Sequence, residues 1–73
     1  MAPSAAEISA ENAVRSWIEN TVKLPQYTDL FLKNGFTNIE MVKALSADDL
    51  YILGINDVGH REMLINEAGK LGN

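Results

Sequence analysis

The sequence predicts a small all-α domain, and three observations support this. Apolar residues recur at helical spacing, first at Val14, Trp17, Ile18 and Val22. No stretch shows the sustained period-two alternation that is typical of a half-buried strand. Capping residues, prolines and glycines divide the chain into short helical segments. With 73 residues, 47% of them hydrophobic, the chain is expected to form one domain that is stabilised by apolar packing.

Composition excludes several classes of site. The chain has no cysteine, which excludes disulfides and thiolate zinc sites, and its one histidine cannot build a metal site alone. We therefore predict no metal and no cofactor. The net charge of −4 argues against binding to nucleic acid or to an anionic membrane surface. The apolar runs are only a few residues long, so no membrane insertion is expected.

The N-terminal residues 1–8 are predicted to form a flexible leader, and residues 9–72 the domain. The leader lacks the basic start and long apolar stretch of a signal peptide. The first helix is predicted to begin near Ser9, a good capping residue, with Glu11 in its first turn. Trp17 is expected to anchor the core, because a large aromatic residue on an apolar stripe is most often buried.

A second helix of about ten residues is predicted after Pro25, which is well tolerated at the first helical position. Tyr27, Leu30 and Phe31 share a face that should pack inward. Gly35 follows a lysine and an asparagine and is a strong stop signal, since it can adopt positive φ.

Two further short helices are predicted from two capping boxes, Thr37–Glu40 and Ser46–Asp49. The third helix would span about residues 38–44, and the fourth would end at Gly54. The residues expected to face inward are Ile39, Val42, Leu45, Leu50 and Leu53.

The last helix is predicted to begin after a cap at Asn56 or Asp57. Its apolar stripe has Arg61 at its edge. The stripe consists of Leu64, Ile65, Ala68 and Leu71.

Two spaced patterns resemble the sterile alpha motif (SAM) domain. The first is Val14-x-x-Trp-Ile followed by Leu24-x-x-Tyr-x-x-x-Phe-x-x-x-Gly-Phe36. The second is Leu53-Gly-Ile-x-x-x-Gly-His-Arg-x-x-Leu64. The resemblance covers about residues 12–71 and is to the domains of ephrin receptor tails, ankyrin-repeat scaffolds and signalling adaptors. It implies a compact five-helix SAM-like bundle with short middle helices and a longer C-terminal helix.

One departure from the SAM pattern lies between the first two helices. The spacing from Trp17 to Leu24 is one residue longer than usual. We expect the turn to bulge there, without loss of the fold.

The resemblance implies an end-helix surface at the start of the last helix, built here from Lys23, Gly59, His60 and Arg61. Basic residues and free N–H groups at a helix start attract carboxylates. His60 could instead pack on its own fold. The residues that follow are Glu62 and Met63, at positions where binding relatives often have Lys or Arg. The end-helix surface therefore carries less positive charge than is usual.

The resemblance also implies an acidic mid-loop surface around the middle helices. Asp29 is a candidate addition to it. Glu40 and Asp49 could already be occupied as capping-box residues, and Met41 could face outward or inward. The surface consists of Asn38, Glu40, Met41, Asp48 and Asp49.

The function predicted from this resemblance is protein–protein interaction within a larger signalling or scaffold protein. The partner would be another SAM domain or other protein, with weak self-association as a further expectation. The net negative charge of the chain favours the mid-loop role, in which the domain binds a basic end-helix surface of another domain. The resemblance, the lack of cysteine and the lack of a signal peptide predict a cytoplasmic location. No enzyme is predicted, because no nucleophile–base motif is present and so small a domain seldom encloses a catalytic pocket.

Two alternatives stay open. Some SAM domains bind RNA hairpins, but this needs a basic cluster, and here Lys23 and Arg61 are opposed by Asp57 and Glu62. A helical interaction domain of another family, such as a death-fold or helix-turn-helix module, would lack the long terminal helix.

Overall fold

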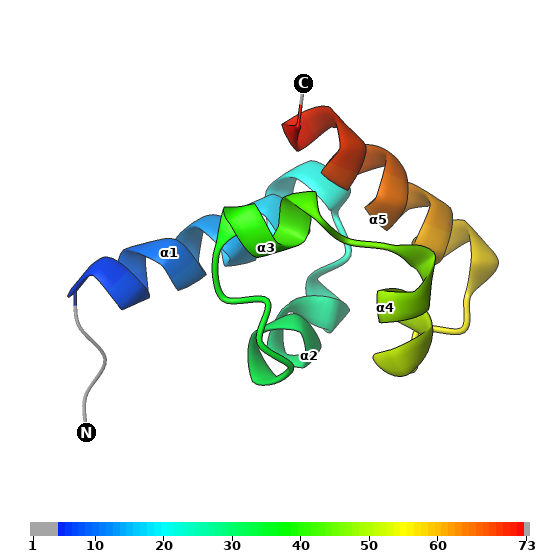
Figure 1. Ribbon diagram of the computed structural model, residues 1–73, viewed down its shortest axis with the longest axis horizontal. Helices are drawn as coiled ribbons and strands as arrows, with labels where there is room; N and C mark the ends of the chain where they lie inside the picture. The colour runs from blue at the N-terminus through cyan, green and yellow to red at the C-terminus, as the bar shows by residue number, and fades with distance from the viewer. Residues whose placement is uncertain (1–4, 73) are drawn as a thin grey trace.

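Every regular element in residues 5–72, the part of the chain that this computed structural model describes, is helical (Figure 1). The π-helix η1 continues α1 and the 3₁₀-helix η2 leads into α2, so the elements form five helices, and α5 with 14 residues is the longest α-helix. The predicted all-α, five-helix fold is confirmed. The elements in order are α1 (Ala5–Ser16), η1 (Trp17–Val22), η2 (Pro25–Tyr27), α2 (Thr28–Lys33), α3 (Ile39–Lys43), α4 (Ala47–Ile52) and α5 (Val58–Leu71).

The first helix begins earlier than predicted. Because α1 already starts at Ala5, Ser9 lies inside the helix and does not cap it, so the predicted start was wrong. The alanines and glutamate before Ser9 are strong helix formers, which explains the extension. Residues 1–4 of the predicted leader lie outside the described residues, and its role as a leader stays a prediction.

The extra residue between the first two helices is accommodated by η1. A π-helix closes its hydrogen bonds over five residues, so each turn holds more residues than an α-helical turn. The segment ends at Lys23, which has a φ of 65° and donates its N–H to the carbonyl of Ile18. The N–H of Leu24 reaches the same carbonyl at 2.9 Å. The prediction placed a bulge in the turn, and the structure has a π-helical segment at the end of the first helix, before that turn.

The core is formed by the predicted apolar faces. Trp17 is 5% exposed, and the centroid of its ring lies 6.4 Å from that of Phe31. Phe36 packs on Phe31 from the turn after α2, with ring centroids 5.4 Å apart. The role of Trp17 as a core anchor is confirmed. The buried hydrophobic residues are Val14, Trp17, Ile18, Val22, Leu24, Phe31, Val42, Leu45, Leu50, Leu53, Ile55, Leu64 and Ala68.

The capping box predicted at Thr37 does not form. Asn38 caps α3 instead, because its side chain accepts a hydrogen bond of 2.9 Å from the N–H of Met41. Asparagine caps a helix at least as well as threonine, and the shift of one residue removes Glu40 from the reciprocal position. Glu40 forms an ion pair with Lys43 at 3.1 Å, and α3 begins at Ile39.

The capping box predicted at Ser46 is confirmed. The N–H of Asp49 donates to the Ser46 hydroxyl at 3.3 Å, and the N–H of Ser46 donates to the Asp49 carboxylate at 2.9 Å. Glycines at positive φ follow α2 and α4, namely Gly35 at 93° and Gly54 at 84°. These two turns direct α3 and α5 back onto the core.

Candidate protein-interaction surfaces

The start of α5 is fixed by its cap. The side chain of Asp57 accepts a hydrogen bond of 2.9 Å from the N–H of His60, so Asp57 rather than Asn56 is the capping residue. Gly59 lies in this first turn, where a Cβ atom would come within 3.3 Å of the Asp57 carboxylate. The absence of a side chain at Gly59 therefore leaves room for the cap.

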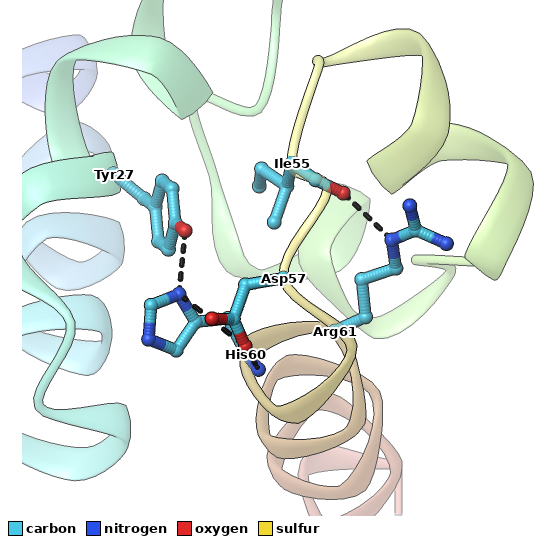
Figure 2. A network of polar contacts seen from close by, with 5 residues as sticks. All are labelled: Tyr27, Ile55, Asp57, His60 and Arg61. Atoms are coloured by element: carbon cyan, nitrogen blue, oxygen red, sulfur yellow. Dashed lines mark hydrogen bonds and ion pairs between the residues drawn. The ribbon is translucent and has the colours of Figure 1, made fainter.

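The ring of His60 is anchored on its own fold. A hydrogen bond of 2.6 Å joins His60 Nδ1 to Tyr27 Oη, with donor and acceptor set by the histidine tautomer (Figure 2). The two rings meet edge to face, with centroids 5.4 Å apart. Asp57 Oδ1 lies 4.0 Å from the same nitrogen. Of the two predicted roles for His60, this contact favours packing on the domain, and it leaves Nε2 as the ring nitrogen for an outside partner.

Arg61 holds the loop between α4 and α5. Its Nε donates a hydrogen bond of 2.6 Å to the carbonyl of Ile55, a residue that is only 1% exposed (Figure 2). The side chain of Arg61 is half-buried. The Nε–H of Arg61 therefore serves the fold, and its terminal nitrogens make no hydrogen bond to another described residue.

Lys23, like Gly59, is an exposed member of the predicted end-helix surface. The π-helix η1 that it caps packs against α5, and Tyr27, four residues later, bonds to His60. Gly59, His60 and Arg61 share the first turn of α5, and Lys23 lies in the segment that joins η1 to Tyr27.

The predicted mid-loop residues fall into two groups. Asn38 caps α3 and Glu40 and Met41 lie on it, whereas Asp48 and Asp49 belong to α4. Helix α3 packs on α1 and on α5, and α4 packs on α5. Figure 1 shows α3 and α4 apart from each other, joined by an extended segment. The prediction assigned these residues to one surface around the middle helices, and the structure places them on α3 and α4.

The acidic candidates differ in whether their carboxylates already have a partner within the domain. Asp49 closes the capping box and Glu40 pairs with Lys43, so both carboxylates have partners within the domain. Asp48 is exposed and makes no polar contact to any described residue. Asp29 is likewise exposed in the first turn of α2. Met41 faces outward with 43% of its surface exposed, which settles its orientation.

Large apolar residues on α4 and at the start of α5 were missed as surface candidates. Tyr51, Ile52 and Val58 are 71%, 79% and 66% exposed. Helical spacing could have identified the first two, because they stand between the inward-facing Leu50 and Leu53. In the sequence they simply continue an apolar run.

The described residues form no candidate metal site and no membrane-spanning helix. Among these, no group of three or more His, Cys, Asp or Glu side chains could hold a metal ion. No helix within residues 5–72 has the length and apolar character to cross a bilayer.

Comparison with known proteins identifies the fold. The family model of the SAM domain (sterile alpha motif) matches residues 7–71. The chain is 37% identical over 60 residues to ephrin type-B receptor 1-A of Xenopus laevis, covering 82% of this chain and 6% of that protein. It is 33% identical over 62 residues to human ephrin type-A receptor 5, covering 85% of this chain and 6% of the receptor. The comparison with solved structures found no match. The chain spans only a small part of these relatives, and by its family match it belongs to the SAM domain family.

Proposed function

We propose that this domain acts within a larger signalling or scaffold protein by associating with another SAM domain, chiefly through its acidic mid-loop side. SAM domains as a family are protein-interaction modules. The finer assignment, the mid-loop role, rests on the contrast between the unpaired carboxylate of Asp48 and the side chains of Arg61 and His60, which bond to Ile55 and Tyr27. The setting we propose is the cytoplasm.

The observation that carries the proposal is the state of Asp48. Its carboxylate is exposed and unpaired among the described residues, so it can accept charge-assisted hydrogen bonds without breaking any contact of the fold. Arg61 and His60 would have to serve a partner with the atoms that their contacts to Ile55 and Tyr27 leave over. The net charge of −4 also favours a basic partner.

Self-association would be weak under this proposal. Head-to-tail contacts propagate only if both faces of the domain are strong and complementary. Here the exposed Glu62 follows Arg61 directly, so the positive charge at the start of α5 is largely offset. The expected partner is therefore a different domain with a more basic end-helix surface.

A probe for this partner can be built from the chain itself. Glu62→Lys and Met63→Arg make the start of α5 basic, and Asp48→Lys blocks the mid-loop side so that the probe does not polymerise. Titration of this triple variant into the unmodified chain, followed by calorimetry, should show binding that weakens steeply as salt is raised.

Single substitutions in the chain that receives the probe test the role of Asp48. Asp48→Lys should reduce probe affinity by roughly tenfold or more, since it replaces an attractive charge by a repulsive one. Glu11→Lys in α1 makes the same charge change and should have little effect. If the unmodified chain does not bind the probe, or if both variants bind equally, the proposed mid-loop role is wrong.

A further inference from the structure

The outer face of α4 combines an unpaired carboxylate with two large exposed apolar side chains. Tyr51 and Ile52 follow Asp48 by three and four positions, which places all three on one side of the helix. On the opposite side, Leu50 is fully buried and Leu53 is 8% exposed. Two neighbouring large apolar residues at 71% and 79% exposure differ from the singly scattered apolar residues of an ordinary surface.

We infer that Asp48, Tyr51 and Ile52, named here the α4 face, form an anchor for a partner surface that has an apolar centre and a basic rim. This inference rests on the proposed mid-loop role and deepens it. Asp48 attracts and orients the basic rim, which mainly raises the association rate. Tyr51 and Ile52 provide the buried area, and tyrosine is among the residues that most often dominate interface energy.

Charge selects the partner class. Two copies meeting through the same face would bring Asp48 close to the Asp48 of the other copy, and such like-charge contacts are unfavourable. An anionic membrane would be repelled by Asp48 and by the net charge of −4. The fitting partner is a protein surface at a helix start, with an exposed apolar residue and neighbouring Lys or Arg. Its apolar residue would pack on Tyr51 and Ile52, and its basic residues would pair with Asp48.

The triple-variant probe has this chemistry. Its own Val58, 66% exposed at the start of α5, supplies the apolar centre, and the introduced bases at positions 62 and 63 supply the rim. The test titrates the probe into the otherwise unmodified chain carrying Tyr51→Ser and Ile52→Ser together. Because both side chains are exposed, the thermal unfolding midpoint should be nearly unchanged.

The expected result is a loss of affinity of about tenfold or more with an unchanged dependence on salt, since apolar area and not charge has been removed. The matched control is Ile8→Ser. Ile8 is 46% exposed on α1, which extends from the opposite end of the molecule (Figure 1). This control should bind the probe like the unmodified chain. The heat-capacity change on binding should also become less negative in the double variant only.

The outcomes separate this inference from the proposal beneath it. If Asp48→Lys weakens binding but Tyr51→Ser with Ile52→Ser does not, the α4 face is overturned and the mid-loop role stands. If the serine variant weakens binding and Asp48→Lys does not, the mid-loop role falls. An equal loss in the Ile8→Ser control would also overturn the α4 face, because the effect would then not be specific to α4.

Discussion

The start of α5 and the outer face of α4 lie at the same end of the molecule but use their polar groups in different ways (Figure 1). At the start of α5, Arg61 and His60 bond to Ile55 and to Tyr27 (Figure 2). On α4, the side chain of Asp48 makes no hydrogen bond or ion pair with the described residues. The residues that identify the family therefore largely maintain the fold, while residues outside the motif are the freer ones for binding.

The largest expected effect comes from Arg61→Met, which keeps much of the side-chain volume and removes the donor. The Ile55 carbonyl then loses a charge-assisted hydrogen bond in a partly buried site, so we expect the free energy of unfolding to fall by about 1.5 kcal/mol. Urea denaturation followed by circular dichroism measures this change.

The matched variant on α4 is Asp48→Asn, which also removes one charge. Because Asp48 has no partner to lose, its stability change should stay within about 0.5 kcal/mol. Equal losses in the Arg61 and Asp48 variants would contradict the difference between the two regions.

A smaller effect is expected from Tyr27→Phe, which deletes only the hydroxyl that bonds to His60. The free energy of unfolding should fall by about 1 kcal/mol, the usual net value of such a hydrogen bond. The same substitution in a His60→Ala background should cost much less, since the partner is already absent. If the cost is the same in both backgrounds, the hydroxyl stabilises the domain through some other contact.

The fold was predictable because its signals are local. Apolar spacing placed Val14, Trp17, Ile18 and Val22 on one buried stripe, and a proline, a glycine and a capping box located the short helices. The extra residue before Leu24 could be counted in the sequence. Its accommodation in a π-helix could not be foreseen, because an insertion can be absorbed in the helix or in the turn.

Competition between neighbouring residues limited the prediction of caps. Thr37 and Asn38 are both capping residues, and the sequence rule favoured Thr37 because Glu40 completes its box. The structure uses Asn38, and Glu40 instead pairs with Lys43. Such a shift by one residue depends on how the chain enters the helix, which is a tertiary property.

The candidate site was predictable in its residues but not in their contacts. His60 and Tyr27 are 33 positions apart, and no local pattern links them. The exposure of Tyr51 and Ile52 was available from their positions next to Leu50 and Leu53. It was overlooked because the expected mid-loop chemistry was acidic.

The smallest expected effect, and one of opposite sign, concerns Lys23, whose side chain is exposed but whose φ is 65°. Left-handed backbone costs a non-glycine residue about 1–2 kcal/mol. Glycine loses about 0.5–1 kcal/mol more than other residues through chain entropy. Lys23→Gly should therefore raise the free energy of unfolding by about 0.5 kcal/mol, as measured by urea denaturation. Lys33→Gly removes the same side chain from helical backbone in α2, so it should lower that free energy. A loss in both variants would mean that the Lys23 side chain stabilises the domain, as Arg61 does, and is not reserved for a partner.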